Sequence, residues 1–511
     1  MATINKYYTG RKRITIPVSR KVFNSNPIKY IDQYLKACVS TNEENKAEAD
    51  DLKLKYRGFQ DIWNKKRLNG DNENNNMVEV NHLFRQVEFK KGFMVGNPIS
   101  YSLGVSDKNT DDLTYLNKYF KDSKKGSLDI DKYEDLYVCG IAEQFVIPKT
   151  YDYDIENEAP FELYNIEVGV GFKVYSNDIT KQPLFDVVVS EVVNEEFKVK
   201  KQYEIYFINA LDGFTYHIVY DSSKKRIENN EAVKQPYKFL PIVEFELNKN
   251  RMGIVELVMS IQEALNIIQS NQIDDIVDFV NAYLVFENQS VGKDYENKMK
   301  MFKQTRTISI KSTNPQLPAK VTLLKQTLQH TEINASFELL LKEMYDIVAC
   351  PQTSGGVTSG GDTGEARILG NGWESAQNQA KVDIGYGIQF EYELLKNILT
   401  ICRTSPNTPI KEIYASDIDI KYSINMSNNI LTKTQALQNL YSMHVPYEEA
   451  LGIVGLTSDT HGLAEKWAKF DKEAKTIATQ MQTKNLGNKS DENKDNSNSD
   501  TNSDSNSDSD N

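Results

Sequence analysis

The segment Pro351-Gln-Thr-Ser-Gly-Gly-Val-Thr-Ser-Gly-Gly-Asp-Thr-Gly364 separates two long stretches of helical periodicity. Before it, apolar residues recur at steps of three and four and define one helix face: Ile333, Phe337, Leu340, Met344, Ile347 and Val348. Pro351 ends this helix because proline cannot continue the hydrogen-bond ladder. A second helical pattern runs from Glu365 to about Cys402. The polar, glycine-rich loop between them has little to bury, and long loops of this kind are usually functional.

Two interpretations of this loop remain open, and a third is excluded. The spacing of Gly356-Val-Thr-Ser-Gly-Gly-Asp-Thr363 is close to that of a phosphate-binding loop. However, Asp362 stands where the lysine should be and would repel phosphate, and the loop follows a helix and not a strand. A nucleotide site is therefore excluded. The loop is either a disordered surface loop or a mobile loop that touches a partner or lines a passage.

The composition limits the class of protein. A chain of 511 residues can form two to four core-bearing regions, and its net charge of −12 argues against a generally basic nucleic-acid-binding surface. The four cysteines have no metal-type spacing and indicate reduced thiols, and the five histidines include no His-x-x-x-His pair. No run of about 18 apolar residues exists, so we expect no membrane span. We also expect no metal and no cofactor.

The first half of the chain predicts helices followed by a sheet. We expect a short helix at 29–37, a charged break at 42–51, and a helix that begins at 56–63. An amphipathic helix at 80–94, an edge strand at 99–102 and a helix pair near 113–136 follow. Short apolar or alternating runs broken by polar turns then predict an antiparallel β region from Tyr137 to Tyr220.

One long helix is predicted from Ile254 to about Ala282. Its apolar positions are Ile254, Leu257, Val258, Ile261, Leu265, Ile268, Ile273, Ile276, Val277 and Val280. The opposite face is polar and consists of Glu256, Gln262, Glu263, Asn266 and Gln269. Strands at 284–286, 307–310 and 319–323 form a small α/β insertion between this helix and the next. One helix that leads outward and one that returns predict a stalk, with the small insertion at its tip.

The second half of the chain predicts helices and an acidic tail. Gly370, Gly372, Gly385 and Gly387 interrupt the long helical pattern, so we expect a kink or local break near one of the two pairs. A strand at 418–422 and helices at 433–441, 447–454 and 458–481 follow. The region 481–511 is rich in Ser, Asp and Asn and should be disordered.

This ordered series of parts resembles the portal proteins of tailed bacteriophages, in particular the family found in siphophages of Gram-positive hosts. The resemblance covers about residues 30–480 and rests on Tyr56-Arg-Gly, Val95-Gly-Asn-Pro-Ile-Ser-Tyr101, Cys139-Gly140 with Glu143, Leu240-Pro-Ile-Val-Glu-Phe245 with the following helix, and the loop and helix at 351–402. It implies an α+β fold of portal type. Its parts would be a wing (1–253), two stem helices (254–283 and 331–350), a clip (284–330), a tunnel loop (351–366), a long kinked helix with the wing return (367–430), a helical crown (431–480) and the disordered acidic tail (481–511).

The resemblance also implies a function without catalysis. Such a protein forms a ring, typically of twelve subunits, at one capsid vertex, and double-stranded DNA is packaged and ejected through it. Its implied partners are the terminase motor, the head–tail connector or adaptor, the major capsid protein and the scaffolding protein. The implied location is the virion, with assembly in the host cytoplasm.

Three groups of site residues follow from the resemblance. The tunnel loop would meet DNA through Thr353, Ser354, Gly355, Gly356, Val357, Thr358, Ser359, Gly360, Gly361 and Asp362. The stem would line the channel with Glu338, Lys342 and Asp346, although Lys342 is also explained as an ordinary solvated or salt-bridged lysine. The clip would bind partners through Lys293, Lys298, Lys300, Lys303 and Arg306, which a plain solvated face explains equally well.

Two other functions compete with a DNA conduit. One is a different virion or scaffold protein without a DNA channel. The other is a metal-dependent nucleic-acid enzyme, which needs clustered carboxylates. Asp274, Asp275 and Asp362 are available for that purpose, but Asp274 and Asp275 are neighbours on a helix and point about 100° apart.

Overall fold

The chain divides into two units, Met1–Met426 and Ser427–Asn511, which are described separately. The computed structural model describes residues 10–66, 75–104, 110–193, 197, 199–227, 231–280, 283–287, 316–318, 320–324, 330–352, 372–406, 408–424, 430–454, 463–464 and 466–476. The predicted acidic tail at 481–511 lies outside these residues.

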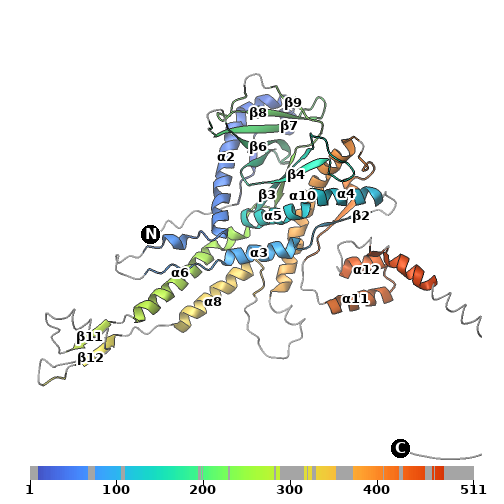
Figure 1. Cartoon of the computed structure of the whole chain (residues 1–511). Helices are drawn as coiled ribbons and strands as arrows, with labels where there is room; N and C mark the ends of the chain where they lie inside the picture. The colour runs from blue at the N-terminus through green and yellow to red at the C-terminus, as the bar shows by residue number, and fades with distance from the viewer. Residues whose placement is uncertain are drawn as a thin grey trace, which may run out of the picture. The chain divides into compact units, whose positions relative to one another are not determined.

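The first unit contains two larger sheets and two strand pairs (Figure 1). The six-stranded sheet has the order β1 (Ile14–Ile16), β5 (Gly171–Ser176), β6 (Pro183–Val193), β7 (Val199–Ile208), β8 (Thr215–Tyr220) and β9 (Val233–Lys234). The three-stranded sheet has the order β10 (Ile242–Glu246), β3 (Ile141–Pro148) and β4 (Phe161–Ile166). The pairs are β2 (Ser100–Leu103) with β13 (Ile418–Lys421), and β11 (Tyr283–Glu287) with β12 (Lys320–Leu324). Only β1 and β5 pair in parallel among these described strands, which confirms the predicted antiparallel region.

Helices surround these sheets and complete a mixed α+β fold, as predicted. In the first unit they are α1 (Arg20–Phe23), α2 (Pro27–Tyr56), η1 (Asp61–Asn64), α3 (His82–Val95), α4 (Thr110–Asp122), α5 (Lys125–Cys139), α6 (Ile254–Val280), α8 (His330–Ile347), α10 (Trp373–Thr404) and η2 (Ala415–Asp417). The second unit contains α11 (Ile430–Ser442), α12 (Tyr447–Val454) and a helical stretch at 466–476.

Helix α2 corrects the prediction of a short helix followed by a charged break. It is one helix of 30 residues that continues through the charged stretch. Asn42 and Asn45 are buried within it, and Asn42 Nδ2 donates to the carbonyl oxygen of Gly169 at 2.8 Å. Asn45 Oδ1 accepts from the backbone N–H of Lys12 at 2.8 Å. The polar residues that suggested a break therefore hold tertiary contacts.

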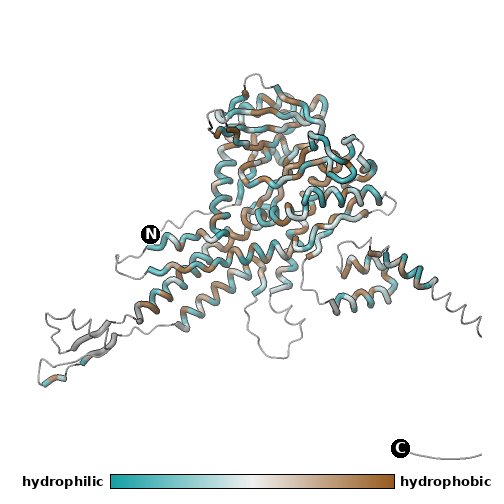
Figure 2. The backbone as a smooth tube through the Cα atoms, in the orientation of Figure 1, coloured by the Kyte–Doolittle hydropathy of each residue, from teal (hydrophilic) through white to brown (hydrophobic). Residues whose placement is uncertain are grey.

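Two apolar cores stabilise the first unit. One lies between the six-stranded sheet and the first half of α2, and it includes Phe23, Leu35 and Phe185. The larger core joins α3, α5 and α10 to the three-stranded sheet, with Tyr137 and Leu394 among its members. Figure 2 shows hydrophobic positions in the strands and helices of this region and again along α6.

Glycine shapes α10 at two places. Gly372 precedes the helix with a φ of 81°, a left-handed conformation that favours glycine, so α10 cannot extend back through it without a break. Helix α10 thus begins directly after the first predicted glycine pair, of which Gly370 lies outside the described residues. The second pair, Gly385 and Gly387, lies within the continuous helix, and no break occurs there. A Cβ at Gly387 would meet Tyr133 Oη at 2.7 Å, so this glycine permits close packing.

The second unit is organised by aromatic residues. Tyr447 stacks on Trp467 with ring centroids 4.5 Å apart, and Tyr441 meets Trp467 edge to face at 5.3 Å. Ala450 and Leu451 of α12 are buried beside them. The predicted helices at 433–441 and 447–454 correspond to α11 and α12.

Two buried glutamates face each other across the three-stranded sheet. Glu143 on β3 is the register partner of Glu244 on β10, and both side chains are almost fully buried. Glu244 binds Arg251, whose Nη2 donates to it at 2.6 Å, and the pKa of Glu244 is lowered: burial opposes this, but Arg251 outweighs it. Burial and the adjacent charge of Glu244 raise the pKa of Glu143 well above its ordinary value. The folded protein therefore favours the protonated form of Glu143 more strongly than the unfolded chain does.

This pair predicts a pH-dependent gain from Glu143→Gln. The unfolded chain ionises Glu143 near its ordinary pKa, whereas the folded chain ionises it only at higher pH, so the wild type loses stability as pH rises above that ordinary pKa. Glu143→Gln removes this loss, and thermal denaturation should show a higher Tm than wild type at pH 8 and a smaller difference at pH 5. Asp186, whose pKa burial raises to about 7, contributes the same trend in both proteins.

Glu244→Gln is the matched control for this prediction. It occupies the opposite register position but removes an ionised partner of Arg251, so it should lower the Tm at pH 8. Equal effects of the two substitutions at pH 8 would contradict the raised pKa of Glu143.

Candidate functional site

The out-and-back helix pair expected from the sequence is present. Helices α6 and α8 lie side by side, and Gln272 Nε2 of α6 donates to Asn334 Oδ1 of α8 at 2.9 Å. The pair leads away from the two larger sheets to β11 and β12, which form an antiparallel pair at its far end (Figure 1). The strand expected at 307–310 lies outside the described residues.

The three residues predicted to line a channel share the exposed face of α8. Glu338, Lys342 and Asp346 are all solvent-exposed. Glu332 and Glu343, which sequence reasoning missed, are also exposed, and they lie about 120° and 140° around the helix from Glu338. Four carboxylates therefore accompany one ammonium group, and this acidic face can repel a polyanion without binding it.

One residue of the predicted apolar face of α8 is exposed to solvent and not buried. Ile347 is 52 % exposed, and Leu339 in the middle of the acidic face is 57 % exposed. Met344, Tyr345 and Val348 are buried. Ile347 is exposed because it lies near the edge of the apolar stripe, whereas the packing partners of α8 contact the side that holds Tyr345.

The polar face of α6 is buried, contrary to a simple amphipathic interpretation. Four polar side chains, spaced four residues apart, are almost fully buried and form what we call the polar ladder: Gln262, Asn266, Ser270 and Asp274. They accept hydrogen bonds from alternate backbone N–H groups of an extended segment: His82 to Gln262 at 3.1 Å, Val80 to Asn266 at 3.2 Å, Val78 to Ser270 at 3.0 Å and Asn76 to Asp274 at 2.7 Å.

The spacing of the polar ladder follows from the two backbone geometries. Four residues of an α-helix advance about 6.0 Å along its axis, and two residues of extended chain advance about 6.6 Å. The helix can therefore present one acceptor for every second N–H of the extended segment. Gln262 Nε2 also donates to the carbonyl oxygen of Val80 at 2.7 Å. The backbone of the segment therefore both donates to α6 and accepts from it, as a strand does with a neighbouring strand.

The two remaining groups of predicted site residues lie outside the described residues. These are the tunnel-loop residues Thr353, Ser354, Gly355, Gly356, Val357, Thr358, Ser359, Gly360, Gly361 and Asp362, and the clip residues Lys293, Lys298, Lys300, Lys303 and Arg306. The residues just before the loop are fixed, because Cys350 and Pro351 are buried. Gln86 Nε2 of α3 also donates to the carbonyl oxygen of Met344 at 3.3 Å.

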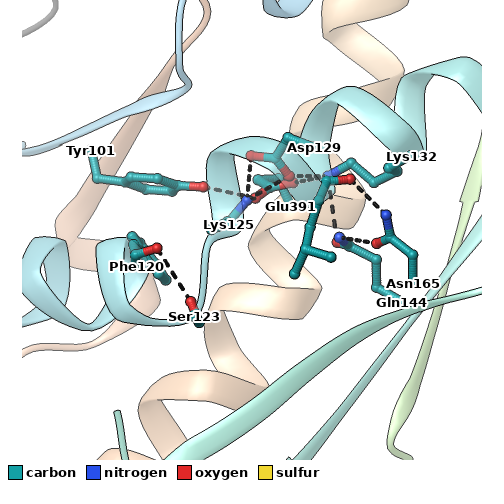
Figure 3. Close-up of polar contacts among 10 residues, drawn as sticks. Tyr101, Phe120, Ser123, Lys125, Asp129, Lys132, Gln144, Asn165 and Glu391 are labelled. Carbon is teal, nitrogen blue, oxygen red and sulfur yellow. Dashed lines mark hydrogen bonds and ion pairs between the residues drawn. The ribbon is translucent and has the colours of Figure 1, made fainter. Parts of the chain in front are cut away.

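A buried charge cluster holds α10 against α5 (Figure 3). Glu391 of α10 contacts Lys125 and lies 2.9 Å from Lys132 Nζ, and Tyr101 Oη donates to it at 2.7 Å. Asp129 accepts from both lysines at 2.9 Å, so the cluster is neutral overall. Burial alone would raise the pKa of Glu391, but the two lysines lower it to about 2. Sequence reasoning did not find this cluster, whose members come from three separate elements.

The acidic residues considered for metal-dependent chemistry do not converge. Asp274 accepts from the backbone and side chain of Asn76 and binds Lys65 Nζ at 3.1 Å, whereas Asp275 is exposed. Within the described residues no group of three or more His, Cys, Asp or Glu side chains could hold a metal ion. Among the same residues no helix has the length and apolar character of a membrane span.

These observations define a mixed α+β protein with a pair of long helices, one of which, α8, exposes a set of mostly acidic residues. A sequence model of the family described as "Phage portal protein, SPP1 Gp6-like" matches residues 35–501. Because this match covers most of the 511 residues, the chain belongs to that family of phage portal proteins. None of the curated proteins matches the chain significantly.

Family membership confirms the resemblance seen in the sequence. The protein serves as a portal in phage DNA packaging, it is a component of the virion capsid, and it assembles as an oligomeric ring with DNA and phage-head partners. The alternative of a virion protein without a DNA channel is thereby set aside. The assignment to siphophages of Gram-positive hosts stays a prediction.

Proposed function

We propose that the acidic face of α8 lines the DNA channel of a ring of about twelve subunits. The observation that supports this most directly is the exposure of Glu332, Glu338, Glu343 and Asp346 on a helix that projects with α6 from the body. DNA affinity grows with each phosphate that a lysine or arginine neutralises. An acidic wall releases few counterions, so the duplex can slide without being held.

The remaining parts of the proposal follow the order of the chain. Residues 1–253 with 367–430 form the wing, and α6 and α8 form the stem. The clip at 284–330 docks the terminase motor during packaging and the head–tail connector afterwards, and the loop at 351–366 faces the DNA. The crown at 431–480 lies inside the capsid. The protein has no catalytic activity of its own, assembles in the host cytoplasm with capsid and scaffolding proteins, and conducts DNA during ejection as well.

The acidic wall predicts a gain of DNA binding on charge reversal. The triple variant Glu332→Lys, Glu338→Lys and Glu343→Lys should bind a short duplex at least tenfold more tightly than wild type at low salt, with a steeper salt dependence. Fluorescence anisotropy over a salt series measures both quantities. Phage carrying this variant should also contain fewer genome-filled heads, because a basic wall retains the DNA.

A second triple variant controls for net charge. Glu191→Lys, Glu231→Lys and Glu412→Lys reverse three exposed carboxylates elsewhere on the same unit. Equal DNA affinity in the two triple variants would contradict the channel assignment. Light scattering and negative-stain images test the ring itself, which should have the mass of about twelve copies and an axial hole.

A further inference from the structure

Helix α6 exposes a stripe that no described residue of the chain covers. Its members recur at steps of three and four: Leu257, Ser260, Ala264, Ile267 and Asn271. Leu257 is 43 % exposed and Ile267 is 44 % exposed, and two small residues lie between them. Ser260 is exposed and Ala264 is half-buried, and such small side chains between two aliphatic ones leave room for a bulky side chain of a partner.

A second exposed apolar surface lies beyond the polar ladder. It consists of Phe59, Trp63 and Phe84, which are 68 %, 53 % and 49 % exposed, and we call it the aromatic patch. Phe84 stacks on Tyr56 with ring centroids 5.4 Å apart, and Trp63 Nε1 donates to Glu79 Oε2 at 2.8 Å. These contacts hold the aromatic rings in place at the surface, which lowers the entropy lost when a partner binds them.

The two surfaces lie on different sides of α6. With about 100° of rotation per residue, the stripe and the polar ladder point about 120° apart around the helix. The aromatic patch is attached on the ladder side, because Gln60 next to it binds Asn266. Each subunit of a cyclic ring needs two different, complementary surfaces of this kind, one for each neighbour.

We propose that the aromatic patch of one subunit docks on the α6 stripe of the next subunit. This inference rests on the proposed function, in which α6 runs along the ring axis as part of the stem. Exposed tryptophan and phenylalanine side chains are the usual anchors of protein interfaces, and the small side chains of Ser260 and Ala264 leave room for them. The occupant is therefore a second copy of this chain.

The position of each residue along the α6 axis specifies which residues of neighbouring subunits can contact each other. Rotation about the ring axis leaves the position of each residue along that axis unchanged. Trp63 lies between Gln60, which binds Asn266, and Lys65, which binds Asp274. Trp63 of one subunit is thus level with the part of the next α6 that contains Ile267. In the same way exposed Lys66 is level with exposed Asp275, and their opposite charges favour the contact.

Cysteine cross-linking tests the contact in the full chain. The four native cysteines are buried, so they do not compete for a thiol reagent. The variant Trp63→Cys with Ile267→Cys, treated with a short bis-maleimide, should give a ladder of covalent oligomers on denaturing gels up to the full ring. Each single-cysteine variant should give no ladder, because a head-to-tail contact joins two different residues.

The control pair is Trp63→Cys with Leu211→Cys, since Leu211 is 94 % exposed at a turn of the six-stranded sheet. It should give no ladder. Rings seen by light scattering without a ladder in the Trp63/Ile267 variant would overturn the docking surface and leave the proposed function intact. A wild-type chain that stays monomeric at every concentration would instead contradict the ring itself.

A charge substitution provides an independent measurement. Ile267→Glu should abolish the ring and leave circular dichroism and Tm near wild type, because the side chain is already half exposed. Leu211→Glu should leave the ring intact. Unchanged rings in Ile267→Glu would mean that the stripe faces solvent or another phage protein, and would overturn the proposal.

Discussion

Glu391→Ala should lower the free energy of unfolding by about 3–5 kcal/mol, because it removes the carboxylate that two buried lysines share. Asp129 would then be the one carboxylate left among the described contacts of the buried Lys125 and Lys132. Tyr101 would lose the acceptor of its hydroxyl group at the same time. We expect this substitution to detach α10 from α5, and chemical denaturation monitored by circular dichroism measures the effect.

The control for this prediction is Glu374→Ala, which removes an exposed carboxylate of the same helix and should cost less than about 1 kcal/mol. An acid titration adds a second readout. The lowered pKa of Glu391 keeps its contribution constant from neutral pH to about 4.5 and removes it between there and about 2. If Glu391→Ala and Glu374→Ala destabilised the protein equally, the cluster would not stabilise the fold.

Arg11→Ala should have a comparable effect, about 3–5 kcal/mol, because it leaves a buried carboxylate without its partner. The Arg11 side chain is fully buried and lies 3.0 Å from Glu256 and 3.1 Å from Glu48. It also donates to the carbonyl oxygen of Cys139 at 3.3 Å. One side chain thus connects α2, the end of α5 and the start of α6, and its loss should loosen the base of the helix pair.

The neighbouring residue supplies the control. Lys12 also pairs with a glutamate of α2, Glu44, at 2.7 Å, but both side chains are more than half exposed. Lys12→Ala should therefore leave the free energy of unfolding nearly unchanged. Hydrogen exchange of α6 amides adds a local readout: Arg11→Ala should increase exchange at the start of α6, and Lys12→Ala should not. Unchanged exchange in Arg11→Ala would argue against the connection.

Local patterns predicted most of the fold. The alternating runs between Tyr137 and Tyr220 became strands, and the period of three and four gave α6 and α8. Burial was harder to predict. Leu257 and Ile267 are exposed while Gln262 and Asn266 are buried, because a helical period separates two faces but does not say which face the chain covers.

The long-range contacts had no local signal. The polar ladder pairs residues near 270 with a segment near 78, about 190 positions away, and neither stretch contains a local pattern that predicts this contact. Glu391 is one of four acids in α10, and no local pattern distinguishes it from the exposed Glu393. Glu332 and Glu343, by contrast, could have been found, since both are acidic residues of the same helix that lie outside its predicted apolar stripe.

The polar ladder also determines how α6 responds to mechanical load. The segment at 76–82 runs beside the helix, and its hydrogen bonds cross from one to the other along four successive positions. A pull along α6 loads these bonds in shear, so all of them resist together and must fail together. A pull at right angles would peel them apart one at a time. The helix is therefore held most firmly against sliding along its own axis, which in the proposed stem is the direction of DNA passage.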